Sequence, residues 1–293
     1  SNDLLIMYKW KYNTNNTWSI EIVNEFKQFC VKNKIKICES YNDIIQNLDS
    51  DYECFVFNKN DEYMINNKLL STHMYHENPK GIIYFDPNKI LKNIYCRACS
   101  IDSSNFFSFP AGIYERDIFN QHQIKHTRIR TPESIKTLIL NNYLTSNKQI
   151  KNYIYFLQTF NDENQEKNNP LYFNICNNSK KSQIITHTTN QHEHWSNLNN
   201  HLFCLCLSWN TLESPRLWES LYFGCIPIII DYYESNNFIE NNYNDLPILH
   251  IKNIDDLFSE SFIKEKYISI ISNVDNYNFD KITMSYWLDI LKR

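Results

Sequence analysis

Apolar and polar positions alternate along the chain in short apolar runs separated by amphipathic stretches. In residues 19–32, Ile20, Val23 and Phe26 recur at helical spacing, whereas residues 54–58 form a short apolar run between polar loops. Strands that alternate with helices are typical of a parallel sheet covered on both faces by helices. For the N-terminal half we expect strands at 3–10, 35–38, 54–58, 81–85 and 106–110, and helices at 19–32, 41–48, 65–73, 88–96 and 132–144.

A second alternation begins near residue 150, after a polar segment that we interpret as an interdomain connection. Residues 171–176 fit a strand or a helix, because short apolar runs do not distinguish the two. We therefore expect an N-terminal domain over 1–147, a C-terminal domain over 148–275, and a helix within 276–293 that packs back across both. In the C-terminal half the expected strands are 152–160, 183–187, 201–208, 225–230 and 247–251, and the expected helices are 192–199, 215–223, 281–293 and two that begin near 254 and 262.

Composition narrows the possible classes of function. The chain has 293 residues, of which 42% are hydrophobic and 15% aromatic, enough for a real core. Only three glycines occur, so a glycine-rich dinucleotide fingerprint and a Walker loop are both excluded. The formal net charge of −4 gives no electrostatic reason to expect nucleic-acid binding. We also expect no membrane-spanning segment in this chain, because no run of eighteen apolar residues occurs.

The cysteine content favours a reducing compartment. The nine cysteines are an odd number and have no disulfide-framework spacing, and Cys204, Cys206 and Cys225 lie within apolar runs as small buried side chains. We therefore expect a cytoplasmic protein. The frequent Asn, Lys, Ile and Tyr are typical of an AT-rich genome such as that of a giant virus or a protist, and in the viral case the compartment is the host cytoplasm.

Residues 214–230 contain the strongest local signals in the chain. Ser214 is a favoured N-cap, and Pro215 suits the first helical position, where no backbone N–H is needed. Gly224 is placed to end the helix in a left-handed conformation. The run 225–230 is apolar throughout and is typical of a strand buried on both faces.

Arg216 and Glu219 are three residues apart, so they share one helical face near the helix start. A helix N-terminus offers unpaired N–H groups and a partial positive charge, which together attract phosphate. An arginine there, with a carboxylate one turn later, suits the phosphates and ribose hydroxyls of a nucleotide. The alternative is an exposed pair spaced for a weak salt bridge, and spacing alone does not choose between them.

This stretch resembles the donor-binding signature of exostosin-like (GT47-like) glycosyltransferases, roughly His-Arg-x-Trp-Glu-Ala-Leu-x-x-Gly-Cys-Ile-Pro-Ile. Further similarities are the strand at 153–160, the closing Tyr286-Trp287 and, more weakly, residues 109–113. Pro215 departs from the signature, which usually has His or Tyr there, and 207–213 lacks the glycines expected upstream of it. The positions that match the signature in order are Arg216, Trp218, Glu219, Leu221, Gly224, Cys225, Ile226, Pro227 and Ile228.

The resemblance implies the GT-B fold: an α/β chain with two Rossmann-like domains whose parallel sheets face a central cleft. It implies transfer of a sugar from a nucleotide-sugar donor, most simply a UDP-sugar, to a glycan or protein acceptor, with inversion and without a metal or another cofactor. Arg216 would bind the pyrophosphate and Glu219 the ribose hydroxyls. Polar residues that follow the strands would line the same donor site, namely Gln158, Thr159, His187, Ser208, Asn210 and Ser214.

An inverting enzyme needs a base that deprotonates the acceptor hydroxyl. By the same topological rule it should follow a strand of the N-terminal half. Asp86 and Glu115 are the best placed, with Asp117 and the segment 75–77 as alternatives.

Two other interpretations stay open. One is a catalytically degenerate nucleotide- or carbohydrate-binding module of a larger glycosylation protein. It is favoured by Pro215, by the missing glycines and by the loop 161–169, which offers only Lys167 to a phosphate. An additional domain beyond this chain would then choose the acceptor. The histidines at 187, 192 and 194 raise the possibility of a metal site, but His192 and His194 are two apart at an expected helix start and would not face one ion together.

Overall fold

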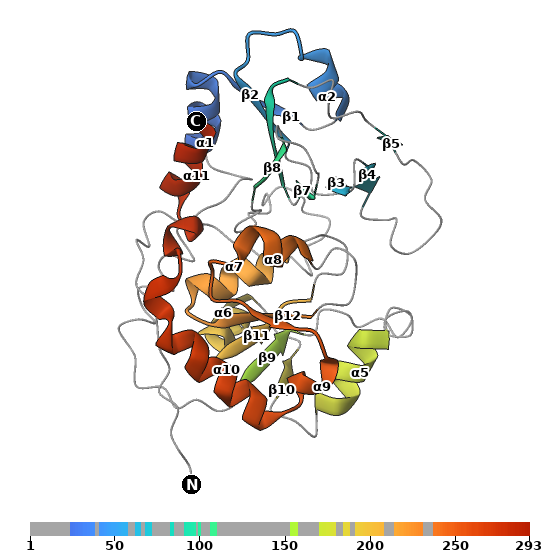
Figure 1. The fold of residues 1–293 in the computed structure, drawn as a ribbon, viewed down its shortest axis with the longest axis vertical. Coiled ribbons are helices and arrows are strands. Elements are labelled where there is room, and N and C mark those ends of the chain that lie inside the picture. Colours follow the sequence, from blue (N-terminus) through green and yellow to red (C-terminus); the bar gives the residue numbers. More distant parts are fainter. Residues whose placement is uncertain are drawn as a thin grey trace.

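The computed structural model shows an α/β protein with one parallel sheet in each half of the chain (Figure 1). The predicted α/β class with a parallel sheet in each half of the chain is confirmed. The predicted domain boundary at residue 147 lies outside the described residues. The structure describes residues 24–38, 41–57, 62–65, 68–71, 83–84, 91–97, 99–100, 106–109, 153–157, 170–179, 184–187, 191–207, 214–230 and 237–293.

The N-terminal sheet has the order β1-β2-β6-β8, and each neighbouring pair is parallel. Its strands are β1 (Ile35–Cys38), β2 (Cys54–Phe57), β6 (Asn93–Arg97) and β8 (Phe106–Phe109). The helices α1 (Asn24–Lys32) and α2 (Tyr41–Gln46) flank β1 in the sequence, as predicted.

A small mixed sheet of order β5-β4-β3-β7 was not predicted. Residues 65–73 were expected to be helical, but β3 (Glu62–Ile65) and β4 (Lys68–Ser71) form an antiparallel hairpin there. The expected strand at 81–85 is the short β5 (Ile83–Tyr84), which pairs with β4 and does not join the parallel sheet. β7 (Cys99–Ser100) pairs with β3.

The helix expected at 88–96 is also wrong, because β6 lies there between β2 and β8. Ile94 and Tyr95 are both buried within that sheet. Pairing with strands on both sides therefore overrides a helical spacing that short apolar runs show by chance.

The C-terminal sheet has the order β10-β9-β11-β12-β13, and all its pairs are parallel. Its chain order is that of a doubly wound sheet, which reverses direction between β9 and β11. The strands are β9 (Ile154–Leu157), β10 (Ile184–His187), β11 (Phe203–Leu205), β12 (Ile226–Ile230) and β13 (Leu249–Ile251).

Helices cover both faces of this sheet, with α6, α7 and α8 on one side and α5 and α10 on the other (Figure 1). The ambiguous segment near 171 is a helix, α5. Buried side chains from every strand and from both helical layers form one core. The helices are α5 (Pro170–Ser179), α6 (Gln191–Asn200), α7 (Pro215–Tyr222), α8 (Asn237–Tyr243), α9 (Ile254–Leu257) and α10 (Glu260–Ser272).

The C-terminal helix α11 (Met284–Leu291) leaves the C-terminal half and runs beside α1 (Figure 1). Trp287 and Leu291 belong to the same buried cluster as Cys30, Ile35 and Val56 of the N-terminal sheet and α1. Just before this helix, the Tyr222 hydroxyl of α7 donates to the carbonyl of Ile282, at 2.8 Å. The end of the chain therefore contacts both halves.

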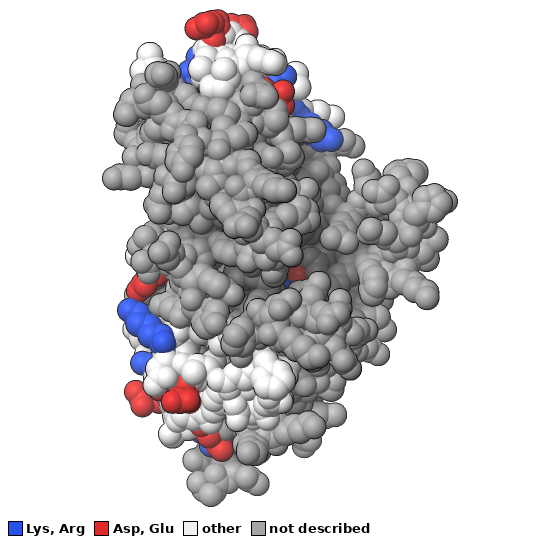
Figure 2. Space-filling view, turned by 90° about the vertical axis from the view of Figure 1, so that its right-hand side faces the viewer, with Lys and Arg blue, Asp and Glu red and all other residues white. Residues whose placement is uncertain are grey.

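Neither the described helices nor the described charged side chains on the face in Figure 2 indicate a membrane-spanning helix or a large charged patch. None of the helices in the described part of the chain is long and apolar enough to cross a membrane. On the face shown in Figure 2, the described acidic and basic residues lie near one another and do not form a patch of one sign.

Candidate functional site

Helix α7 begins and ends as the local sequence predicts. Ser214 has an extended conformation, and its hydroxyl accepts from the backbone N–H of Arg216 at 3.3 Å. At the other end Gly224 has a φ of 69°, and the N–H of Cys225 donates to the carbonyl of Ser220 at 2.9 Å. This is a Schellman ending, which turns the chain directly into the fully buried strand β12.

The sheet topology places the start of α7 at the carboxyl edge of the strands. Helix α7 connects β11 to its parallel neighbour β12, so it runs back along the sheet and its first residues lie where β11 ends. Strand β11 is next to β9, and the winding reverses between them. Ligands of doubly wound sheets bind at this reversal, beyond the carboxyl ends of the strands.

Arg216 is half-buried in the first turn of α7. Its Nε is buried, and no group of the described residues accepts a hydrogen bond from it. The expectation that this helix end offers free backbone N–H groups is wrong for two positions. The N–H of Arg216 donates to the Ser214 hydroxyl, and the N–H of Leu217 donates to the Ser214 carbonyl at 3.0 Å. Attraction of an anion would therefore rest mainly on the guanidinium and the helix dipole.

Glu219 has no exposed surface, although it lies one turn after Arg216. One of its carboxylate oxygens, Oε2, lies 2.8 Å from Nε2 of His194, which is 1% exposed. The alternative of an exposed surface pair between Arg216 and Glu219 is therefore wrong. The physical reason is that α7 is covered by the sheet on one side and contacts α6 on another, so the helix has little solvent-facing surface.

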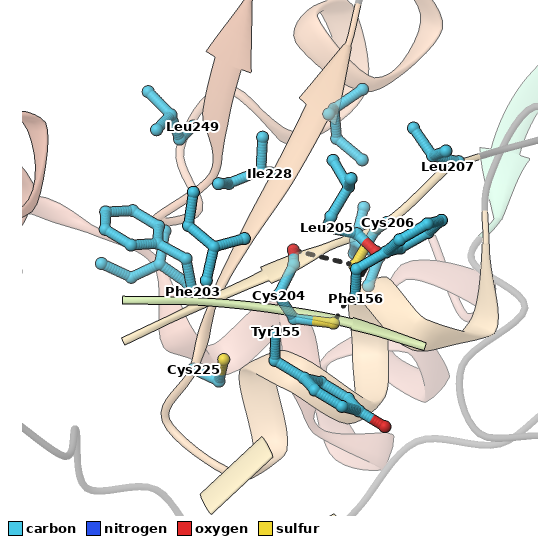
Figure 3. Close-up of a cluster of buried hydrophobic side chains, with 14 of the residues drawn as sticks. Tyr155, Phe156, Phe203, Cys204, Leu205, Cys206, Leu207, Cys225, Ile228 and Leu249 are labelled. Atoms are coloured by element: carbon cyan, nitrogen blue, oxygen red, sulfur yellow. Dashed lines mark hydrogen bonds between the residues drawn. The ribbon is translucent and has the colours of Figure 1, made fainter. Parts of the chain in front are cut away.

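The buried polar contact continues from His194 into the sheet. The Tyr155 hydroxyl on β9 lies 3.1 Å from Nδ1 of His194, and their rings are 5.6 Å apart. Figure 3 shows Tyr155 and Phe156 pointing to opposite sides of β9, and Phe156 packs against Tyr172 of α5. A neutral imidazole satisfies this arrangement, because Nε2–H donates to Glu219 while Nδ1 accepts from the tyrosine hydroxyl.

Sequence reasoning did not find this role for Tyr155 and His194. Tyr155 lies within the apolar strand at 153–160 that resembles the family, and His194 lies in a helix rich in Asn and His. Neither position carries a signal for a polar contact with Glu219. Only the order of β9, α6 and α7 in the fold brings the three side chains together.

Only two of the remaining predicted site residues, Ser214 and His187, lie within the described part of the chain. Ser214 is the N-cap of α7, next to Arg216. His187 is the last residue of β10, at the carboxyl edge of the sheet, but its side chain is not described. Outside the described residues lie Gln158, Thr159, Ser208, Asn210 and the candidate bases Asp86 and Glu115.

Cys204, Cys206 and Cys225 are buried among apolar side chains, as predicted. The thiol of Cys206 lies 3.5 Å from the carbonyl of Cys204 (Figure 3). It lies 3.7 Å from the Ser220 hydroxyl. Burial raises the pKa of the Cys206 thiol well above its ordinary value, which favours the protonated thiol over the thiolate. Within the described ranges no three His, Cys, Asp or Glu side chains gather in a way that would hold a metal ion.

Comparison with known families identifies the family of this chain. The family model of the exostosin GT47 domain matches residues 93–247, more than half of the chain. The protein belongs to the exostosin GT47 family. The matched region contains β6 and β8 of the N-terminal sheet and the C-terminal half through α8, including Tyr155, His194, Arg216 and Glu219. It is therefore a member of a glycosyltransferase family.

Two solved structures share a more distant likeness with this exostosin-family chain. The crystal structure of an α1,3-fucosyltransferase is 11% identical, with 84% of this chain and 79% of that chain covered and a TM-score of 0.39. The crystal structure of TarM is 15% identical, with 88% and 55% covered and a TM-score of 0.35. No curated protein matches the sequence significantly.

Proposed function

We propose that this exostosin-family protein transfers a sugar from a nucleotide-sugar donor, most simply a UDP-sugar, to a hydroxyl of a glycan or glycoprotein. The observation that carries the proposal is Arg216: a half-buried guanidinium in the first turn of a helix at the reversal of a doubly wound sheet. A partly desolvated arginine at such a position suits a diphosphate, because its planar donors match phosphate oxygens.

Departure of the nucleoside diphosphate builds negative charge on the pyrophosphate. A guanidinium held beside a helix N-terminus stabilises that charge more in the transition state than in the bound donor, which is what accelerates the reaction. In this proposal Arg216 binds the pyrophosphate, and no metal ion or other cofactor takes part. Gln158, Thr159, His187, Ser208, Asn210 and Ser214 complete the donor site.

Glu219 is proposed to bind the ribose. A carboxylate has about four acceptor positions, so it can hold His194 and a pair of ribose hydroxyls at the same time. Because Glu219 has no exposed surface in this structure, a ribose reaches it only after neighbouring side chains move. Donor binding should therefore be coupled to a local rearrangement next to α7.

For the acceptor step we propose an inverting displacement. A carboxylate from the N-terminal half, Asp86 or Glu115, accepts the proton of the acceptor hydroxyl as its oxygen attacks the anomeric carbon. The bond to the nucleoside diphosphate breaks as the new glycosidic bond forms, on the opposite face of the sugar.

The test measures release of nucleotide from UDP-, GDP-, CMP- and dTDP-sugars by wild type and by Arg216→Ala. The control variant is Arg293→Ala, which removes an exposed arginine at the chain end. We expect hydrolysis with one nucleotide family, a loss of about ten- to hundredfold in Arg216→Ala, and no change in the control. Equal rates for wild type and Arg216→Ala would contradict the proposed role of Arg216.

The second candidate function is a degenerate binding module. It is favoured by Pro215 and by the absence of glycine in residues 207–213, which limits how closely a backbone can approach a pyrophosphate. In the same panel this function predicts nucleotide binding without release of nucleotide from any donor.

A further inference from the structure

Three polar side chains from three separate elements form a buried chain of contacts behind Arg216. Tyr155 of β9 and Glu219 of α7 are 0% exposed, and His194 of α6 between them is 1% exposed. The contacts are 3.1 Å from the tyrosine hydroxyl to Nδ1 and 2.8 Å from Nε2 to the carboxylate.

Stability alone is a poor explanation for this arrangement. Taking a carboxylate and an imidazole out of water is costly, and well-packed apolar side chains commonly serve a helix contact equally well or better. Three buried neighbours of Glu219 on α7, Leu217, Trp218 and Leu221, are apolar and 0% exposed, and the buried Ser220 hydroxyl donates within the helix, to the carbonyl of Arg216. The Tyr155–His194–Glu219 contacts therefore lie where apolar side chains would also pack well.

We propose that His194 is a positioning residue for the donor site: it fixes the Glu219 carboxylate in the orientation that binds the ribose hydroxyls. This rests on the proposed function. Nε2 of His194 holds one carboxylate oxygen, and the Tyr155 hydroxyl holds the opposite edge of the imidazole. The ring is thereby fixed from both sides, and its orientation is set by the sheet.

The position of His194 fits this role. It lies in the first turn of α6, and α6 follows β10, so this turn lies near the carboxyl edge of the sheet. Glu219 lies one turn after Arg216 in α7. A carboxylate fixed in this way has a defined distance from the guanidinium, and a ribose and its pyrophosphate need such a fixed spacing.

Two substitutions separate the contacts of the imidazole. The amide of Gln at 194 reaches the place of Nε2 and can still donate to Glu219, whereas the shorter Asn reaches only the place of Nδ1 and can contact only Tyr155. The probes are UDP and 2′,3′-dideoxy-UDP, titrated calorimetrically into wild type, His194→Gln and His194→Asn. Circular dichroism and thermal unfolding show whether each variant is folded.

We expect wild type to bind UDP about tenfold or more tightly than the dideoxy analogue, because the analogue lacks the two hydroxyls that donate to the Glu219 carboxylate. In His194→Asn that ratio should fall toward one while the affinity for the dideoxy analogue stays near that of wild type. In His194→Gln the ratio should stay within about threefold of wild type. A purely structural residue would lower both affinities or neither, and would leave the ratio unchanged.

Tyr155→Phe is the second variant, and it keeps the ring but removes the hydroxyl. We expect a smaller fall of the same ratio, so the proposal stays testable if His194→Asn does not fold. An unchanged ratio in every folded variant, with wild type binding UDP, would overturn the role of His194 and leave the proposed function intact. Failure of wild type to bind UDP would overturn this proposal and the choice of a UDP-sugar as the donor.

Discussion

Arg216 and Glu219 are three residues apart in one helix, yet their surroundings differ. Arg216 is half-buried in the first turn, and no group of the described residues accepts a hydrogen bond from its buried Nε. Glu219 is fully buried and its carboxylate lies on His194. In the proposed function the arginine therefore contacts the ligand directly, whereas the glutamate is already held by His194 before a ligand binds.

A second residue-scale property concerns the thiols of the N-terminal cluster. Burial, with the charge of a neighbouring thiol or carboxylate as a smaller cause, raises the pKa of Cys30 to about 12 and that of Cys54 to about 11. Both thiols should resist alkylation at pH 8 in the native protein and react once it is unfolded. Mass spectrometry of the two peptides measures this, and equally fast labelling with and without urea would be the contrary result.

The same shifts predict the direction of a pH effect on stability. An unfolded thiol ionises near pH 9, whereas these two keep their protons in the folded state to about pH 11 or 12. The unfolded state therefore binds fewer protons in that window, and the free energy of unfolding should fall as pH rises from 9 toward 12. In a Cys30→Ala, Cys54→Ala variant the fall should be smaller.

At the scale of elements, α7 is defined by its own ends. Ser214→Ala removes the side-chain acceptor of the cap and should lower the free energy of unfolding by about 1 kcal/mol. The matched control is Ser259→Ala, which removes the N-cap of α10, where Ser259 accepts from the N–H of Phe262. Chemical denaturation should show a similar loss for both.

Only Ser214→Ala should also weaken nucleotide binding, because only Ser214 fixes the turn that carries Arg216. Equal nucleotide affinity in the two capping variants would place Arg216 outside the binding site. The comparison separates loss of a cap in general from loss of this one.

The same element shows what sequence can predict. The cap, the proline at the first turn and the glycine at the end are local signals, and the structure contains all three where they were predicted. Burial of Glu219 was not predicted, since periodicity assumes one solvent-facing side, and α7 is covered on more than one. Strand β6 was missed within residues 88–96 because it depends on pairing with the separate strands β2 and β8, which a local pattern does not show.

At the scale of the whole molecule, the C-terminal helix links the two halves. Trp287 packs in the N-terminal cluster, and its indole N–H donates to the carbonyl of Lys281 at 2.7 Å. Within the described chain the same terminal segment is anchored to α7 through Tyr222 and Ile282. Residues that are last in the sequence therefore stabilise strands that are among the first.

Trp287→Ala should lower the free energy of unfolding by about 3–5 kcal/mol, since it removes a large buried side chain. Ile268→Ala, which truncates an exposed apolar residue of α10, is the control and should have little effect. Thermal unfolding followed by circular dichroism measures both. A small effect of Trp287→Ala would mean that α11 contributes little to holding the N-terminal sheet.

A thermal-shift screen tests whether a nucleotide donor binds at Arg216. UDP-, GDP-, CMP- and dTDP-sugars are compared on wild type and Arg216→Ala. At a hundred times its dissociation constant, a nucleotide that binds only the folded state stabilises it by about 2.7 kcal/mol. We predict a shift with one nucleotide family, UDP first, that disappears in Arg216→Ala. No shift with any of these donors, or the same shift in both proteins, would contradict binding of a nucleotide donor by Arg216.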